Sequence, residues 1–260
     1  MHRNFKLLAI LLTGLLILSI MVSGCGNSQT VTVTKTSTVT ATQGQTATTT
    51  ANTSELSGTI TTAGSTTVQP LAEKLAEQFM SNHPQVSIII QGGGSSVGVK
   101  SANDGTVDIG QASRELKSSE PALVTHTLAR DGIAIVVHPD NNVSELTAEQ
   151  VREIFAGNIS NWSDVGGDNE EIHIVCREEG SGTRAAFQEM VMGDDLEISK
   201  TAILQSSNGA IMQVVKDDPD SIGFVSFGYL NDSVKAITID GVEATTENAK
   251  NGTYPVVRPL

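Results

Sequence analysis

The sequence predicts an α/β protein, in which β-strands and α-helices alternate along one chain. From residue 58 onward, short runs of β-branched residues alternate with longer segments whose apolar residues recur at helical spacing. Glycine and hydroxyl residues separate most of these runs from the segments that follow them. Hydrophobic residues make up 38% of the 260 residues, and 24 more are glycine, which suffices for a sizeable core in one or two domains.

Strands are predicted where β-branched residues cluster, over residues 58–63, 86–90, 132–138, 172–176 and 222–225. The second and third of these are apolar enough to be buried on both faces, as in a parallel sheet. Helices are predicted over residues 68–80, 97–103, 146–155, 184–192 and 210–216. The first helix places its apolar residues on one face, at Val68, Leu71, Leu75 and Phe79.

The charge and the aromatic content exclude several classes of function. There are 16 basic and 29 acidic residues, a net charge of −13, and aromatic residues make up only 3% of the chain. Nucleic-acid binding relies on a basic surface and on stacking aromatics, so we expect no nucleic-acid partner. Sugar binding, which favours aromatic platforms, and adhesion to anionic membranes are disfavoured as well.

Residues 1–24 are predicted to be a lipoprotein signal peptide. Arg3 and Lys6 form a positive start, and residues 7–22 form an apolar run that is short for a membrane-spanning helix. The sequence Val-Ser-Gly-Cys at 22–25 resembles the lipobox of exported prokaryotic lipoproteins, in which the cysteine (here Cys25) becomes the lipidated first residue. The alternative is an uncleaved anchor. Either way the globular part is extracytoplasmic, and a lipidated Cys25 leaves Cys176 without a disulfide partner.

Residues 25–56 are predicted to be a disordered, threonine-rich stalk. The segment 27–54 contains 12 threonines and a single charged residue, Lys35. It has no large apolar face whose burial would compensate for ordering the backbone. The stalk is a candidate for O-glycosylation, and the alternation of Val31 and Val33 leaves an edge strand as the other interpretation.

A turn of glycine and hydroxyl residues recurs before the predicted helices, at residues 64–67, 92–96, 180–183 and 206–209. The free backbone N–H groups at a helix N-terminus, with serine or threonine beside them, suit an oxyanion. Ligands of open α/β sheets bind at the carboxyl ends of the strands, where these turns are expected. One turn alone is equally well explained by helix capping, but several that converge would form an anion site.

Three other short motifs resemble a nucleophile, a phosphate-binding loop and a metal site, but each is incomplete. Residues 94–98 match the Gly-x-Ser-x-Gly elbow of serine hydrolases, with Ser96 as nucleophile, but the later histidines lie in or beside predicted strands. Val99 interrupts the P-loop pattern, because it separates Gly98 from the lysine that follows. His173 and Cys176 fall on opposite faces of a strand and suit no shared metal. We therefore expect no enzyme activity, no metal and no cofactor.

The chain resembles the phosphate-binding lipoproteins of ABC phosphate importers, the PstS type. The resemblance rests on motifs that occur in the family's order: Ala-Gly-Ser-Thr-Thr at 63–67, Gly-Gly-Gly-Ser-Ser at 92–96, Asp-Ile-Gly at 108–110, Arg-Glu-Glu-Gly-Ser-Gly-Thr-Arg at 177–184, and Ile-Gly-Phe-Val at 222–225. It covers residues 57–260 and implies a type II periplasmic-binding-protein fold, with two α/β lobes, a hinge and a cleft between them. Residues 57–131 and 228–260 would form lobe I, and 132–227 lobe II.

The resemblance also implies the ligand-binding residues. Thr66 and Thr67 would donate from the first loop, and Ser95 and Ser96 from the second. Arg177 would be the charged clamp. Ser181, Gly182 and Thr183 would complete the shell, with Arg184 either a second cation or a residue that faces solvent.

The chain departs from the family at one position. Many members have an aspartate after the Ala-Ser that follows Asp-x-Gly, and it accepts the proton of hydrogen phosphate. Here Ser113 is followed by Arg114. Both are candidate ligand-binding residues, but an arginine accepts no proton. Glu115 or Glu179 could take over this role, and sulfate, molybdate or tungstate are the alternative ligands.

The expected partners follow from the same resemblance. They are inorganic phosphate, the permease subunits of an ABC transporter, and the membrane through the lipid on Cys25, for a protein expected to be a monomer. A surface interaction or phosphate-sensing protein on the same fold is a further reading. Residues 253–260 read as the beginning of a strand, whereas family members continue with elements that finish lobe I. We therefore expect a lobe I that lacks part of its cover.

Overall fold

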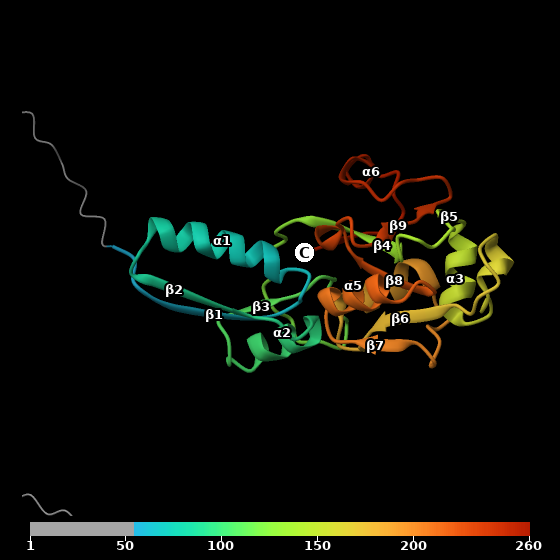
Figure 1. The fold of residues 1–260 in the computed structure, drawn as a ribbon. Helices are drawn as coiled ribbons and strands as arrows, with labels where there is room; N and C mark the ends of the chain where they lie inside the picture. Colours follow the sequence, from blue (N-terminus) through green and yellow to red (C-terminus); the bar gives the residue numbers. More distant parts are fainter. Residues whose placement is uncertain (1–54) are drawn as a thin grey trace, which may run out of the picture. The chain divides into compact units, whose positions relative to one another are not determined.

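The computed structural model describes residues 55–260, and within them strands and helices alternate as predicted (Figure 1). The predicted signal peptide, Cys25 and all but the last two residues of the predicted stalk lie outside the described residues. Residues 52–260 belong to one unit by their contacts. Within residues 55–260, no helix combines the length and the apolar character needed to cross a bilayer.

The strands in chain order are β1 (Gly58–Gly64), β2 (Val86–Gln91), β3 (Ile109–Gln111), β4 (Arg130–Val137), β5 (Glu145–Leu146), β6 (His173–Arg177), β7 (Ile203–Gln205), β8 (Ser221–Ser226), β9 (Lys235–Ala236), β10 (Thr238–Ile239) and β11 (Val257–Pro259). The α-helices are α1 (Gln69–Asn82), α2 (Ser95–Asn103), α3 (Ala148–Ala156), α4 (Gly182–Phe187), α5 (Asn208–Asp217) and α6 (Thr246–Asn251). Short 3-10 turns lie at Trp162–Val165 and Phe227–Tyr229, and a π-helical turn, Gln188–Met192, continues α4.

The first lobe consists of a three-stranded parallel sheet in the order β2-β1-β3, with α1 and α2 on opposite faces (Figure 1). Its strand ends are tied together, because the backbone and hydroxyl of Thr61 both donate to the carboxylate of Asp108. Helix α2 packs with its backbone almost on the sheet. A Cβ on Gly110 would lie 2.4 Å from the carbonyl oxygen of Gly98, so only glycine allows this approach.

The second lobe contains a mixed sheet in the order β11-β4-β8-β6-β7, with β9 also paired to β4. Strand β4 is buried on both faces, as its sequence predicted: Ile133 and Ile135 pack with α3 and α4, whereas Ala134 and Val136 pack with α5. Its pairing differs from the prediction of a parallel sheet. Strand β4 runs antiparallel to β8 and β11, and only β6 pairs in parallel with its neighbours.

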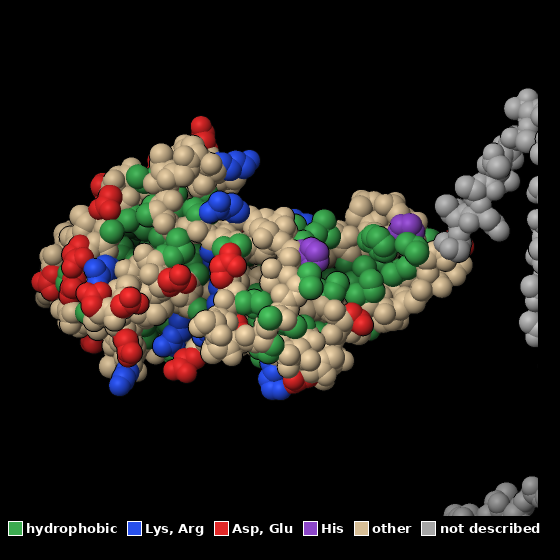
Figure 2. Space-filling view, turned by 180° about the vertical axis from the view of Figure 1, so that it is seen from behind, with side chains coloured by type: hydrophobic (Ala, Val, Ile, Leu, Met, Phe, Trp, Pro, Cys, Tyr) green, Lys and Arg blue, Asp and Glu red, His purple; other side chains and the backbone are tan. Residues whose placement is uncertain are grey.

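The first lobe leaves apolar side chains of β2 and α1 open to solvent. Strand β2 was expected to be buried on both faces, but it is an edge strand on which Ile89 is exposed. The apolar face of α1 is only partly covered, since Val68 is buried but Leu75 is 53% exposed. Figure 2 shows hydrophobic side chains gathered over this lobe, whereas most acidic side chains in that view lie over the second lobe.

Residues 228–256 belong with the second lobe, which corrects the prediction that 228–260 return to lobe I. Strand β9 pairs with β4, and β10 pairs with β5. The ring of Tyr254 is buried in the same core as β4, and its hydroxyl donates to the carbonyl of Ile133 at 2.9 Å. The segment stays there because its apolar side chains complete this core.

We predict that Phe187→Ala lowers the free energy of unfolding by about 3–5 kcal/mol, because it empties a fully buried site. The Phe187 ring stacks on Phe224 with ring centres 4.1 Å apart and meets Phe155 edge-on at 4.8 Å. Urea unfolding followed by circular dichroism measures the loss. Phe79→Ala is the control, since Phe79 is 38% exposed, and it should cost about 1 kcal/mol or less. Equal losses for the two variants would contradict the proposed packing.

Candidate functional site

Hydroxyl side chains from both lobes meet at one buried place. The first lobe brings Thr67 from the end of β1 and Ser113 from the loop after β3, and the second lobe brings Thr183 from α4. Thr67 Oγ1 lies 3.1 Å from Thr183 Oγ1 across the lobe boundary. The hydroxyl residues gathered here are each at most 8% exposed: Ser65, Thr66, Thr67, Ser95, Ser113, Ser181 and Thr183. Six of these seven are predicted ligand-binding residues, and Ser65 was not predicted.

The predicted turns place these residues by capping helices. Ser65 Oγ accepts the N–H groups of Thr67 and Val68 at the start of α1. Ser181 Oγ accepts from the N–H of Arg184 and caps α4. Gly94, with a φ of +90°, precedes α2 and turns the chain so that Ser95 begins the helix at the site.

The two lobes touch at Gly182. A Cβ on Gly182 would lie 2.2 Å from Ser95 Oγ and 2.6 Å from Ser113 Oγ, so no larger residue fits without separating the lobes. The backbone N–H of Ser96 donates to the carbonyl of Gly180 at 3.1 Å. The second lobe therefore closes against the first with backbone contact.

Arg177, at the end of β6, links the lobes with a buried guanidinium that is 1% exposed. Its Nε and Nη2 donate to both carboxylate oxygens of Glu178, at 3.0 and 2.9 Å. Its Nη1 donates to Thr66 Oγ1 at 3.3 Å. The charge of Arg177 therefore lies beside the hydroxyl cluster, and a neighbouring carboxylate balances it.

Besides Ser65, the structure adds four residues that sequence reasoning missed. Arg258 on β11 donates to Thr67 Oγ1 at 3.1 Å and to the carboxylate of Asp131 on β4 at 3.0 and 3.2 Å. Asn208 at the start of α5 donates to Thr67 Oγ1 at 2.9 Å, and the Tyr229 hydroxyl donates to the carbonyl of Thr66 at 2.7 Å. The turn at 206–209 was the only sequence signal for any of them, because it places Asn208 at a helix start.

Burial shifts the pKa values of Asp131 and Arg258 in opposite directions. Loss of solvent raises the pKa of the Asp131 carboxyl above its ordinary value, although Arg258 and Ser226 pull it down. Loss of solvent likewise lowers the pKa of Arg258 to about 10, against the pull of Asp131. Each charge compensates for the other's desolvation, so the pair is a unit in which neither partner is favourable alone.

Two predicted cations point elsewhere. Arg114 makes a bidentate pair with Glu120, at 2.7 and 2.8 Å, and a third bond to the Ser96 hydroxyl at 3.2 Å. The carboxylate of Glu120 therefore neutralises the charge of Arg114. In return, the hydrogen bond from Arg114 lowers the pKa of Glu120. Arg184 donates to the backbone carbonyl of Arg177 at 2.9 Å, so it holds the backbone of Arg177 in place.

Among the described residues, the structure places neither the predicted proton acceptors in the hydroxyl cluster nor a histidine beside Ser96. Glu115 and Glu179 are both exposed, and Glu178 is the acidic residue of this loop that faces the Arg177 guanidinium. The Ser96 hydroxyl accepts from Arg114, whereas His138 and His173 bond to residues 140 and 218. A serine hydrolase site would need a histidine at Ser96, and nothing in residues 55–260 supplies one.

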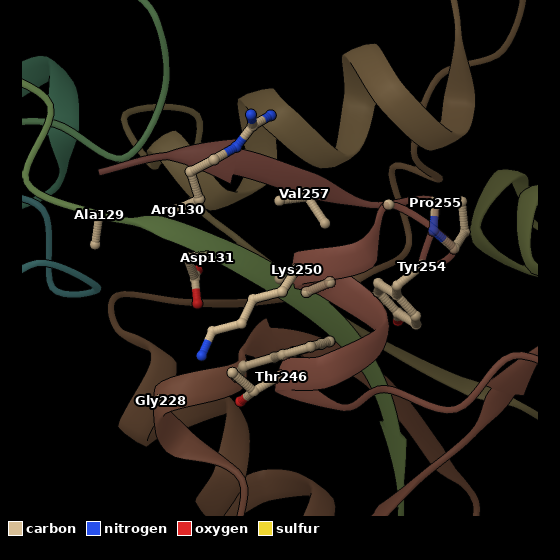
Figure 3. Close-up of a pocket in the computed structure, with 13 residues that line it drawn as sticks. Ala129, Arg130, Asp131, Gly228, Thr246, Lys250, Tyr254, Pro255 and Val257 are labelled. Carbon is tan, nitrogen blue, oxygen red and sulfur yellow. The ribbon is translucent and has the colours of Figure 1, made fainter.

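A separate hollow lies beside β4 and β11. It has a volume of about 890 Å³ and is lined by β4, the turn at Phe227–Tyr229, α6 and β11, and Lys250 and Asp131 point into it (Figure 3). Its walls bring together few polar donors compared with the hydroxyl cluster. In the part of the chain that the structure describes, no group of three or more His, Cys, Asp or Glu side chains could bind a metal.

The hydroxyl cluster suits a small, oxygen-rich anion. It offers several hydroxyl protons and two guanidinium groups in a place shielded from water, where hydrogen bonds to an anion are stronger than in solvent. Each guanidinium already has one carboxylate partner, so an entering anion meets donors whose own charge is balanced. The most reasonable candidate ligand is therefore a tetrahedral oxyanion.

Comparison with known proteins gives consistent matches. The family model described as "PBP superfamily domain" matches residues 36–260, which begins inside the segment predicted as a stalk. The "Phosphate-binding protein PstS" of Bacillus subtilis is 36% identical over 205 residues, 77% of this chain and 68% of that protein. The protein of the same name from Pseudomonas aeruginosa is 32% identical, over 80% of this chain and 72% of its own length.

Solved structures agree with these relatives. A crystal structure from Clostridium perfringens, described as a phosphate ABC transporter substrate-binding protein with bound phosphate, is 43% identical and superimposes with a TM-score of 0.76 over 78% of this chain and 84% of that one. An ABC-type phosphate transport receptor from Vibrio cholerae is 38% identical, with a TM-score of 0.63 over 77% and 84% of the two chains.

We predict that Gly182→Ala destabilises the closed arrangement by about 1–3 kcal/mol, because the new methyl group overlaps Ser95 Oγ and Ser113 Oγ. Gly180→Ala is the matched control two residues earlier. Its Cβ would meet nothing nearer than 3.9 Å and should change stability by no more than about 0.5 kcal/mol. Thermal unfolding midpoints compare the two, and an unchanged midpoint for Gly182→Ala would show that the lobes do not meet there.

Proposed function

Because the chain belongs to the PBP superfamily and, within it, to the PstS family of phosphate-binding proteins, we propose that it binds inorganic phosphate between its lobes and delivers it to the permease of an ABC importer. The observation that carries this proposal is the buried cluster of hydroxyl groups, contributed by both lobes, beside the Arg177 guanidinium. The role is binding and transfer, without covalent chemistry.

The ligand-binding set follows from the contacts. Residues at the lobe boundary would surround the phosphate: Thr66, Thr67, Ser95, Ser113, Arg177, Ser181, Gly182 and Thr183. Charge-assisted hydrogen bonds contribute about 1.5–3 kcal/mol each, so a few of them supply the roughly −8 kcal/mol of micromolar binding. Ser96, Arg114 and Arg184 would support the set from outside, since their polar groups are held by other residues.

Binding would require the lobes to separate and close again. The bond between Thr67 and Thr183 and that between Ser96 and Gly180 cross the boundary, and the first of them occupies hydroxyl groups that the phosphate would use. A phosphate that enters would take over hydroxyl donors from both lobes at once. Its affinity would therefore stabilise the closed form, which is the form that a permease can distinguish from the open one.

Phosphate and sulfate differ in one property that the site can detect, which is the proton on hydrogen phosphate. Hydrogen phosphate carries a proton and sulfate does not, and Arg114, at the usual place of an aspartate, accepts none. Phosphate is the proposed ligand because the similar crystal structure from Clostridium perfringens holds phosphate. Sulfate is the second candidate, since the donors at the site suit an anion whose oxygens all accept.

The location of the protein completes the proposal. We infer that Cys25 carries a lipid and that residues 25–56 tether the binding unit at the outer face of the cytoplasmic membrane. The support is the positive start, the apolar run and the Val-Ser-Gly-Cys sequence in the first 25 residues. A tether of this kind keeps the binding protein close to its permease and raises its local concentration there.

We predict that the full chain, purified in detergent, releases heat on titration with phosphate and binds it at micromolar concentration or tighter. Arg177→Met should weaken binding by at least about 30-fold, since it removes one partner of a buried, hydrogen-bonded charge. Arg152→Met is the control, because Arg152 pairs with Asp195 on the surface, and its affinity should stay within twofold. Absence of heat with phosphate, sulfate, arsenate, molybdate and tungstate would refute the proposed function.

We predict that Cys25→Ser moves the protein from the membrane fraction to the soluble fraction and abolishes incorporation of radiolabelled palmitate. The reason is that a covalent lipid holds the chain at the bilayer. Cys176→Ala is the control, since Cys176 is fully buried and should leave the labelling intact. Labelling that persists in Cys25→Ser would disprove lipidation at this cysteine.

A further inference from the structure

Arg258 makes more side-chain hydrogen bonds in the site than any other residue that sequence reasoning missed. It lies on β11, directly opposite Asp131 on the antiparallel strand β4. Its Nη1 donates to the carbonyl and hydroxyl of Ser113 at 3.1 and 3.3 Å, and its Nη2 donates to Thr67 Oγ1 at 3.1 Å. With 2% of the side chain exposed, these bonds are made away from water.

The partners of Thr67 fix the direction of its hydroxyl proton. A guanidinium and an amide NH₂ can only donate, so Thr67 Oγ1 accepts from both Arg258 and Asn208. Asn208 keeps this orientation because its Oδ1 accepts from the N–H of Ser226 at 3.2 Å. Both lone pairs of Thr67 Oγ1 are then filled. The hydroxyl must therefore donate, and in this structure Thr183 is its acceptor.

The hydroxyl of Ser113 is likewise left with only its proton to donate. Ser65 Oγ accepts from two backbone N–H groups, so its own proton goes to Ser113 Oγ at 2.9 Å. Arg258 supplies the second donor to Ser113 Oγ at 3.3 Å. Because both lone pairs are filled, the Ser113 proton points toward the remaining neighbour, Ser95 Oγ at 3.4 Å, which lies on the lobe boundary.

We propose that Arg258 is a further anion-site residue, and that it commits the Thr67 and Ser113 hydroxyls to donate to the bound anion. Asp131 is the positioning residue: its Oδ2 accepts from two nitrogens of Arg258, and its Oδ1 accepts from the Ser226 hydroxyl at 2.8 Å. This inference rests on the proposed function, because it describes how the same site presents its donors to phosphate.

The proposal has a consequence for specificity. A hydroxyl with an unfilled lone pair can turn to accept a proton from a ligand, whereas one committed to donation cannot. Thr67 and Ser113 therefore favour anions that present bare oxygen atoms. Removing Arg258 would free one lone pair on each hydroxyl and weaken the binding of every oxyanion, with the largest loss for sulfate, which has no proton to offer.

The test compares phosphate and sulfate affinities by calorimetry in the full chain. Arg258→Lys keeps the positive charge beside Asp131, but a single ammonium nitrogen cannot bond Thr67, Ser113 and Asp131 in the same fork geometry. We expect it to weaken phosphate binding about tenfold and sulfate binding, where measurable, by more. The control is Arg130→Met, since Arg130 is an exposed arginine at the adjacent position of β4, and its affinities should stay within twofold.

A double-mutant cycle separates this role from a general loss of structure. Thr67→Val replaces the hydroxyl by a methyl group and should itself weaken phosphate binding about tenfold. If Arg258 acts in part through Thr67, combining Arg258→Lys with Thr67→Val should weaken binding by clearly less than the product of the two single losses, and what remains of the Arg258 effect acts through Ser113. A double variant whose loss of phosphate affinity equals the product of the two single losses would overturn the proposal. Thermal unfolding verifies that each variant is folded.

Two further outcomes distinguish this inference from the proposed function. Should Arg258→Lys prove unfolded, the paired change Asp131→Asn with Arg258→Met removes both charges together, and we expect at least a tenfold loss of phosphate affinity. A wild-type chain that binds phosphate, together with a folded Arg258→Lys or paired variant within twofold of it, would overturn the inference alone. A wild-type chain that binds no oxyanion would overturn the proposed function.

Discussion

The two lobes meet through hydroxyl groups whose hydrogen-bonding directions are fixed by neighbours that can only donate. Thr66 Oγ1 accepts from Arg177 and Asn208, and Thr67 Oγ1 accepts from Arg258 and Asn208. A hydroxyl has one proton and two lone pairs, so these contacts leave each of the two hydroxyls only its proton to donate. The turns, the helix starts and the close approach at Gly182 all serve to bring such committed donors to one place.

The same principle explains how an acidic protein can select an anion. The chain carries a net charge of −13, which disfavours anions at long range but is screened within about 10 Å at ordinary salt. At the site, the guanidiniums of Arg177 and Arg258 are each balanced by one carboxylate. Selection therefore depends on local donors in a dry environment, whereas the acidic side chains seen over the second lobe in Figure 2 mainly affect solubility and the rate of approach.

The sequence allowed prediction of those parts that depend on local signals. The order of strands and helices, the burial of β4 and the hydroxyl turns at helix starts were readable because periodicity and capping act over a few residues. Arg258 and Asp131 were not, since their partners lie 127 to 191 residues apart in the chain. Arg114 was assigned to the ligand because nothing in its motif reveals that Glu120 neutralises it. The position of residues 228–256 was missed for a similar reason, since burial of Tyr254 depends on a core built by distant segments.

The placement of the Asp131–Arg258 pair connects recognition to the motion of the lobes. Asp131 lies on β4 and Arg258 on β11, and the two are register partners in this antiparallel pairing. Arg258 also reaches Thr67 and Ser113 of the first lobe, so a rotation about these strands changes its distance to hydroxyl groups that would hold the anion. A buried ion pair resists separation strongly, because each charge left alone would be unsolvated. Opening of the lobes would therefore leave the Asp131–Arg258 pair intact and move Arg258 away from Thr67 and Ser113.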